Sequence, residues 1–264
     1  EKKKTKWSDS FNFINDGGHC ENGLYALKAN YGLAGLDINS LKKFRSIQSP
    51  LSGHGEAHLF PEGVLVSNGP LGSGLPQAQG LAFADRLAGR KRTTICAITD
   101  GAAMEGEAKE AFAAIPGLAA RGKLASFVCI LSDNNTKLSG RIDQDAFDMG
   151  PSFKALKTQG WRVISLDDGN HLQACASVLE EALSTAEQDP TQPVLVHART
   201  VKGKGHKKSE ESKSGGHGFS LKSADELSAM LTEIFEGQSI PEVFLKWTED
   251  LIASEKAIKA QPKK

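Results

Sequence analysis

The sequence lacks three features that would place a protein in a class at once: long apolar runs, an excess of one charge, and clustered cysteines. Its 264 residues hold 32 Lys and Arg against 32 Asp and Glu, so the formal net charge at pH 7 is zero. This balance argues against nucleic acid or a membrane surface as the main partner. No apolar run reaches the roughly 18 residues of a transmembrane helix, so we expect no membrane span.

The cysteines are few and far apart, which excludes the common metal-binding spacings. They are Cys20, Cys96, Cys129 and Cys175, and two of them stand inside apolar segments, where buried free thiols are common. The charged residues 1–6 have no apolar segment behind them, so they do not form a signal peptide. We therefore expect a protein of a reducing, cytoplasmic compartment.

What is present is an alternation of strand-like and helix-like segments from residue 75 onward. Apolar, β-branched runs predict strands over 93–98, 125–131, 161–166 and 193–198. Between and before them, helical patterns predict helices over 75–87, 104–121, 151–159 and 170–187. This order predicts an α/β fold with three layers, α/β/α, around a mainly parallel sheet.

The rest of the chain is predicted as follows. Helices are expected over 21–31 and 38–44, the second with Asp37 or Asn39 near its cap, and an amphipathic helix over 223–235 starts with Ser223 and Glu226 three residues on. Loops are expected over 48–74 and 200–222. We expect one domain over residues 1–240, without its first N-terminal segment, and a linker-like tail over 241–264.

Two polar clusters follow neighbouring strands. Thr99-Asp100-Gly101 comes after the first predicted strand and Ser132-Asp133-Asn134-Asn135 after the second. Ligands bind at the carboxyl ends of strands in an open α/β sheet. A carboxylate and an amide oxygen there suit a hard divalent cation, and Mg²⁺ usually carries phosphates. Together the clusters predict a metal-diphosphate site.

Each cluster alone also has a structural explanation. Asp100 could be a helix cap, which contributes about 1 kcal/mol, and Asn134 and Asn135 could form a turn, because Asn tolerates left-handed backbone. The glycine-rich segment 69–74 (Gly-Pro-Leu-Gly-Ser-Gly) precedes a helix and could present N–H groups to a ligand, or be a tight turn.

Four histidines stand beside glycines in predicted loops: His19, His54, His206 and His217. A His flanked by Gly can approach a ligand closely and move protons near pH 7. The structural alternative is a solvated loop side chain. No close His spacing supports a zinc site built from histidines.

In their order, these motifs resemble transketolase, specifically its N-terminal half that binds the diphosphate of thiamine diphosphate. Asp100-Gly101 followed by Asn134-Asn135 is similar to the signature of thiamine diphosphate enzymes, and segment 69–74 is similar to the family's Gly-Pro-Leu-Gly-x-Gly. Met104-Glu105-Gly106, the segment 41–45 followed by Gly53-His54, Gly160-Trp161 and His217-Gly218 also fit the family pattern.

The resemblance implies a role for each matched residue. Mg²⁺ or Ca²⁺ would be held by Asp100, by the Asn134 side chain and by the Thr136 carbonyl. Thiamine diphosphate would be contacted by His19, Gly69, Pro70, Leu71, Gly101, Asn134 and His217. His54 and His217 would assist proton transfers on the substrates, and Glu105 would join a carboxylate network at a subunit interface.

The implied reaction moves a two-carbon ketol unit from a ketose phosphate to an aldose phosphate, with the cofactor as electron sink. The family's second domain, which binds the pyrimidine ring and carries the activating glutamate, has no counterpart in the sequence. We therefore expect this chain alone to be inactive, and to act as a fragment of a longer chain or as one subunit of a split enzyme. A homodimer or a heterotetramer is expected.

The sequence departs from the family in three places. Thr99 replaces the first Gly of Gly-Asp-Gly, the spacing from Asp100 to Asn134 is about four residues longer than in the family, and the earlier Gly-His-Pro-Gly segment is absent. Two other functions stay open. Thr200 to Gly205 would also suit 1-deoxyxylulose-5-phosphate synthase or another thiamine diphosphate enzyme, and the departures would suit a degenerate, non-catalytic subunit.

Overall fold

The structure is a computed structural model that describes residues 7–217 and 221–261. The Lys-rich start and Gly218 of the His217-Gly218 motif lie outside the described residues. The chain divides into two compact units. Unit 1 comprises residues 1–135 and 147–200, and unit 2 comprises 136–146 and 201–264.

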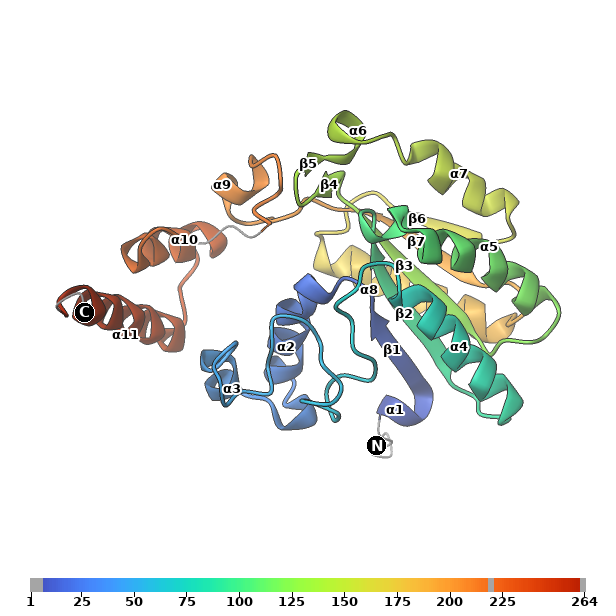
Figure 1. Cartoon of the computed structure of the whole chain (residues 1–264), viewed down its shortest axis with the longest axis horizontal. Helices are drawn as coiled ribbons and strands as arrows, with labels where there is room; N and C mark the ends of the chain where they lie inside the picture. The colour runs from blue at the N-terminus through green and yellow to red at the C-terminus, as the bar shows by residue number, and fades with distance from the viewer. Residues whose placement is uncertain (1–6, 218–220, 262–264) are drawn as a thin grey trace. The chain divides into compact units, whose positions relative to one another are not determined.

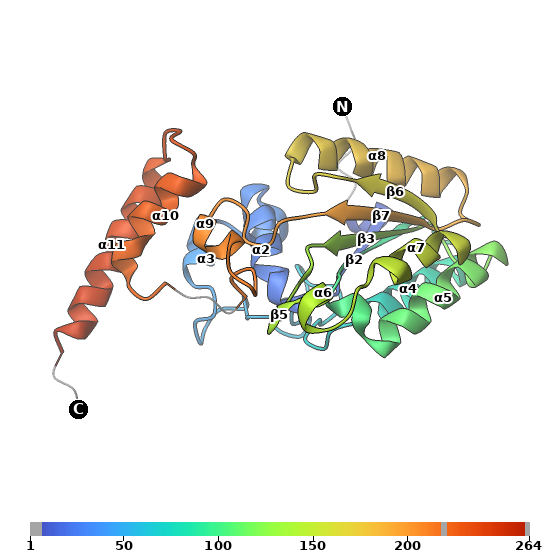
Figure 2. The same ribbon diagram turned by 90° about the horizontal axis from the view of Figure 1, so that it is seen from above.

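Unit 1 is built on a five-stranded parallel sheet. Its strands, in spatial order, are β1 (Phe11–Asn15), β2 (Thr93–Thr99), β3 (Phe127–Asp133), β7 (Val194–Arg199) and β6 (Arg162–Leu166). Every neighbouring pair is parallel, so all carboxyl ends meet at one edge (Figure 2). The expected α/β class with a parallel sheet is confirmed.

Helices cover both faces of this sheet (Figures 1 and 2). On one face lies α8 (Leu172–Gln188), whose Ala182 and Ala186 pack with Val194 and Val196. The other face carries α4 (Gly74–Leu87), α5 (Gly106–Ala120) and α7 (Gly150–Thr158). There the Trp161 indole donates a hydrogen bond of 2.8 Å to the Phe112 carbonyl. Covered faces explain why the inner strands read as continuous apolar runs.

Strand β1 was not predicted, because its five residues precede a turn that dominates the local pattern. Its alternation is real, however, since Asn12 and Ile14 are buried. Asn12 donates a hydrogen bond of 2.7 Å to Asp85 of α4, which satisfies its amide inside the core. The short helix α1 (Trp7–Ser10) before it was also missed. The other strands of the sheet and the helices α4, α5, α7 and α8 lie where they were predicted, with ends shifted by at most two residues.

A second, smaller core supports the long loop over 48–74. It forms under η1 (Gly18–Cys20), α2 (Glu21–Asn30), η2 (Leu33–Gly35) and α3 (Ile38–Lys42). Tyr25 at its centre is fully buried and packs with Phe60 and other apolar side chains. Of the two cap candidates, Asp37 is the N-cap of α3: its carboxylate accepts the Ser40 N–H at 2.8 Å.

Unit 2 contains a two-stranded hairpin, several short helices and the long helix α11 (Glu242–Lys259). Its elements are β4 (Thr136–Lys137), β5 (Gly140–Arg141), α6 (Ile142–Asp145), α9 (Lys207–Glu210), η4 (Ala224–Glu226), α10 (Leu227–Ile234) and α11 (Glu242–Lys259). The helix expected over 223–235 is divided into η4 and α10, with Ser223 capping η4. The expected linker-like tail contains α11, and the domain boundary at residue 240 stays a prediction. None of the helices within the described ranges is long and apolar enough to cross a bilayer.

Candidate functional site

The carboxylate of Asp100 joins the carboxyl ends of β2 and β3. Asp100 follows β2 directly and is 1 % exposed. Its Oδ1 accepts the Gly101 N–H at 2.8 Å, and its Oδ2 accepts the N–H groups of Asn134 at 2.8 Å and Asn135 at 2.5 Å. The two predicted clusters therefore meet at neighbouring strand ends, as expected.

This geometry does not make Asp100 a helix cap. The 3-10 helix η3 (Ala102–Met104) and α5 both start without a side-chain capping bond at their N-cap residues. Instead, Thr99 accepts the Ala102 N–H at 3.2 Å, so the residue that replaces the family's glycine takes a local structural role. The turn interpretation holds for Asn135, whose φ of 57° is left-handed.

The donor set at this edge suits a hard cation. Burial raises the pKa of Asp100 above its usual value, the three backbone N–H bonds oppose this rise, and the Asp133 carboxylate adds to it. A carboxylate has about four acceptor positions, so three bonds leave one position on Oδ1 for a cation. The amide oxygen of Asn134 is buried beside the same loop. Carboxylate and amide oxygens are ligands that Mg²⁺ and Ca²⁺ prefer.

No group of three or more His, Cys, Asp or Glu side chains within residues 7–217 and 221–261 is arranged to hold a metal ion. A cation at the Asp100 edge would depend on amide and carbonyl oxygens as well as on one carboxylate.

The glycine-rich segment 69–74 lies against the end of β1 and against Glu105. Asp16, which follows β1 and is fully buried, accepts the Gly72 N–H at 2.8 Å and the Leu75 N–H at 3.1 Å. Gly72 has a φ of +84°, and a Cβ built on it would stand 2.5 Å from the Glu105 Cβ. Glycine is therefore required at position 72. The neighbouring Leu71 is exposed.

The loops of His19 and His54 meet through Asn68. A Cβ on Gly18 would lie 1.9 Å from the Asn68 carbonyl oxygen, and the Asn68 side chain accepts the Gly55 N–H at 2.6 Å. His54 is exposed and His19 partly exposed, as groups that face a ligand must be. The structure thus gathers the predicted residues of unit 1 on loops at one edge of the sheet.

The buried side chain of Glu21 connects the loops of His19 and His54 through hydrogen bonds. Its buried carboxylate accepts hydrogen bonds from the side-chain amides of Asn15 at 2.9 Å and Asn68 at 2.8 Å, and Lys28 lies 3.6 Å away. Burial lowers the pKa of Lys28, and the Glu21 charge opposes this shift. One carboxylate therefore connects the end of β1, the start of α2 and the segment before Gly69.

Two of the predicted site residues, Thr136 and His217, belong to unit 2. Arg141 donates to the Thr136 hydroxyl at 2.9 Å, which closes the β4–β5 hairpin. The His217 Nδ1 and the Lys202 Nζ are 2.8 Å apart. Burial lowers the pKa of His217, and the Lys202 charge lowers it further, so both effects favour the neutral ring. The place of these two residues in a site with unit 1 stays a prediction.

Three residues at this edge were missed by the sequence analysis. Asp16 and Glu21 have no motif around them, although Asp16 directly follows the alternating strand β1. His197, in the middle of the apolar strand β7, pairs with Asp133 at 2.8 Å. For His197 the sequence offers one signal, a polar residue inside an apolar run. This signal does not show that Asp133 is its partner.

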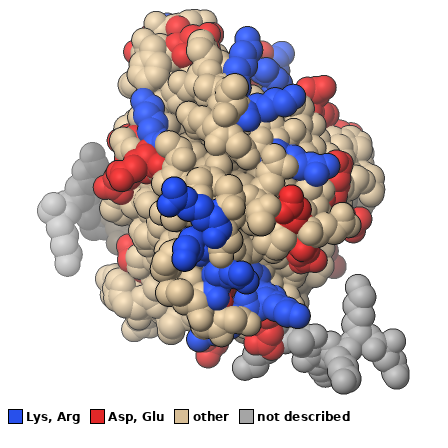
Figure 3. Space-filling model, turned by 90° about the vertical axis from the view of Figure 1, so that its right-hand side faces the viewer, with Lys and Arg blue, Asp and Glu red and all other residues tan. Residues whose placement is uncertain are grey.

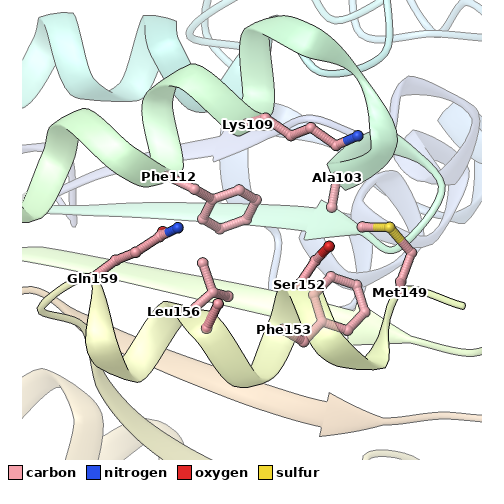
Figure 4. A pocket seen from close by; sticks show the side chains of 9 residues that line it. Ala103, Lys109, Phe112, Met149, Ser152, Phe153, Leu156 and Gln159 are labelled. Atoms are coloured by element: carbon pink, nitrogen blue, oxygen red, sulfur yellow. The ribbon is translucent and has the colours of Figure 1, made fainter.

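An apolar pocket of about 270 Å³ lies between α5 and α7, with Ala103 of η3 in its lining (Figure 4). Phe112, Phe153 and Leu156 point into it, with Lys109 at its rim (Figure 4). None of the predicted site residues lines this pocket.

Comparison with known proteins places the chain beside one enzyme family. A family model described as "Transketolase, thiamine diphosphate binding domain" matches residues 1–261. The chain is 33 % identical to a chromosomal transketolase of Cupriavidus necator over 243 residues, which are 86 % of this chain and 33 % of that protein. It is 31 % identical to a transketolase of Nostoc sp. over 230 residues, 83 % of this chain and 32 % of that protein. The chain thus spans about a third of the length of these relatives.

Solved structures give the same result. A transketolase from Pichia stipitis in complex with sedoheptulose-7-phosphate is 26 % identical, with a TM-score of 0.72 over 96 % of this chain and 38 % of that one. A transketolase from Campylobacter jejuni is 25 % identical, with a TM-score of 0.68 over 98 % of this chain and 40 % of that one.

Proposed function

The chain belongs to the transketolase family, whose thiamine diphosphate-binding domain it matches, and on this premise we propose that it serves ketol transfer between sugar phosphates. The donor would be a ketose phosphate and the acceptor an aldose phosphate. The observation that carries the proposal is the Asp100 carboxylate, buried at the carboxyl edge of the sheet and bonded to the N–H groups of Asn134 and Asn135.

The proposed cofactor is thiamine diphosphate with Mg²⁺, or Ca²⁺ in its place. Asp100 and the Asn134 amide would hold the cation, with the Thr136 carbonyl as the third protein ligand. Gly101 would face the diphosphate, where a residue without a side chain lets the backbone approach closely. When bound, thiamine diphosphate supplies the electron sink for breaking and forming a carbon–carbon bond.

The remaining residues would orient the ligands and move protons. His19 would face the diphosphate, and Gly69, Pro70 and Leu71 would border the rings of the cofactor. The imidazole of His54, exposed on its loop, and that of His217, whose pKa is lowered by burial and Lys202, would exchange protons with sugar hydroxyls. His217 would serve both the cofactor and the substrate.

A partner would complete this site. The relatives are about three times longer than this chain, so a second domain or subunit that binds the pyrimidine ring and carries an activating glutamate belongs to the proposal. Glu105 is exposed beside the glycine-rich segment, which suits a contact with such a partner. We propose a homodimer or a heterotetramer, and no activity for this chain alone.

The test is cofactor binding followed by an assay. Calorimetry is carried out with thiamine diphosphate and Mg²⁺, first on this chain and then on the chain mixed with a pyrimidine-binding domain, with EDTA as the control. Metal-dependent binding is expected, together with turnover of xylulose-5-phosphate and ribose-5-phosphate in the mixture only. Absence of binding even with the partner would reject the proposal, and binding without turnover of these sugars would favour the non-catalytic or synthase-like alternatives.

A further inference from the structure

A second cavity lies at the opposite, amino-terminal edge of the sheet in unit 1. Its volume is about 760 Å³, which is within the range of small-molecule sites. The end of α4, the start of β2 and the segment before β3 form its wall. In Figure 1 the helices α4 and α5 end toward the right-hand side of the molecule. Figure 3 views that side and shows groups of Lys and Arg side chains on it.

Cations dominate the lining of this cavity. Arg86, Arg90, Lys91 and Arg92 line it, against the single carboxylate of Glu187. The buried carboxylate of Asp85 lies behind Arg92 and accepts two hydrogen bonds from it, at 2.5 and 2.9 Å. Asp85 and Glu187 offset two of these four cations, and the charge of Asp9 also acts on Arg92, so the lining keeps a smaller excess of positive charge for an external anion.

The ends of helices account for part of this charge. The helices α4, α5 and α8 end at this edge, where their last carbonyls carry partial negative charge. Arg86 neutralises such a helix end, because its Nε donates a hydrogen bond of 2.8 Å to the Gly122 carbonyl after α5. Arg90 and Lys91 are different. The Arg90 side chain is 60 % exposed and reaches Asp85 only at 3.4 Å, and Lys91 is exposed and in no salt bridge with the described residues.

This cavity is remote from the proposed cofactor. Thr93, the first residue of β2, lines the cavity, and Asp100 follows the last residue of the same strand. Seven residues of strand at about 3.3 Å each separate the two by roughly 23 Å. A ligand in the cavity cannot take part in chemistry at Asp100, so it would form a separate site.

We propose that this cavity binds a phosphorylated small molecule, with Arg90 and Lys91 as its main phosphate contacts and the Ser126 hydroxyl beside them. Arg90 and Lys91 stand in the short connection between α4 and β2, and both line the same cavity. Guanidinium and ammonium groups are the usual partners of phosphate oxygens in proteins.

The probe is inorganic pyrophosphate, titrated by calorimetry in EDTA. The test variant is R90Q/K91Q, and the matched control is K154Q/K157Q, which removes the same charge from two exposed lysines of α7 outside the cavity. EDTA removes the cation on which the proposed cofactor site depends, so the titration reports binding that needs no metal. We expect R90Q/K91Q to weaken binding at least about tenfold, and K154Q/K157Q to bind like the wild type.

Several outcomes would overturn this inference. They are no pyrophosphate binding by the wild type in EDTA, unchanged binding by R90Q/K91Q, or an equal loss in K154Q/K157Q. Circular dichroism checks the folding of each variant. Should R90Q/K91Q fail to fold, the exposed single variant Lys91→Glu replaces it, with the same expectation. Pyrophosphate binding that appears only when Mg²⁺ replaces EDTA would agree with the proposed cofactor site and would contradict this second site.

Discussion

Asp16 and Asp100 are buried carboxylates whose hydrogen bonds come from backbone N–H groups rather than from cationic side chains. Asp16 bonds the N–H groups of Gly72 and Leu75, and Asp100 bonds those of Gly101, Asn134 and Asn135. Burial raises the pKa of both groups in spite of these bonds. The negative charge of these two carboxylates is therefore only partly compensated. A bound cation would stabilise the loops around them by compensating the rest.

Gly72 offers a test of how tightly this cluster is packed. We expect Gly72→Ala to lower the free energy of unfolding by about 2 kcal/mol, because of its positive φ and the overlap with Glu105. The matched control is Gly80→Ala in α4, where a Cβ meets no atom within 4 Å. The control should be neutral or stabilising by about 0.5–1 kcal/mol. Equal effects of the two variants in urea unfolding would contradict the account.

The placement of Asp100 and Asn134 at neighbouring strand ends could be predicted from the sequence, because each directly follows an apolar strand. Residues that act through long-range contacts could not be placed in this way. Asp16 and Glu21 could not be, because their partners lie 47 to 59 residues away along the chain. No sequence pattern near Glu21 predicts its hydrogen bond with Asn68.

Among the elements, strands β2 and β3 position the candidate site. Their register pairs Thr99 with Ser132, so the residues that follow them emerge side by side. Both strands were predicted, because buried parallel strands are apolar throughout. β1 was not, because a five-residue edge strand with two Asn gives a weak pattern. The segment 200–222 was expected to be a loop, and within it the structure adds the short helix α9.

The connection that leads from β7 to His217 gives a pH prediction. His217 has a pKa below its usual value of 6.5, because of burial and the Lys202 charge. A base whose pKa is lowered by folding loses folded-state stability as the pH falls below its unfolded pKa, so this loop should loosen below about pH 6.5. The NMR titration midpoint of the His217 ring should lie below 6.5 and rise in Lys202→Gln. The matched variant Lys213→Gln, an exposed lysine of the same segment, should leave it unchanged. A titration midpoint that does not change in Lys202→Gln would contradict the contact between Lys202 and His217.

On the scale of the whole molecule, unit 1 has two edges of different chemistry. The carboxyl edge gathers Asp16, Asp100 and loop histidines, and the amino edge gathers Arg90, Lys91 and their neighbours. The zero net charge of the chain hides this separation, so composition alone could not reveal the basic cavity. The division into two units was also unpredictable, since residues 136–146 join a unit made mainly of residues after 200.

The central claim is that Asp100 holds the cation of a diphosphate cofactor. Its most direct test is calorimetry of thiamine diphosphate with Mg²⁺ on Asp100→Ala, beside Asp250→Ala, which removes an exposed carboxylate of α11. We predict that Asp100→Ala lowers the affinity at least about tenfold, or about 1.4 kcal/mol, while Asp250→Ala binds like the wild type. A folded Asp100→Ala chain that binds with unchanged affinity would contradict the claim.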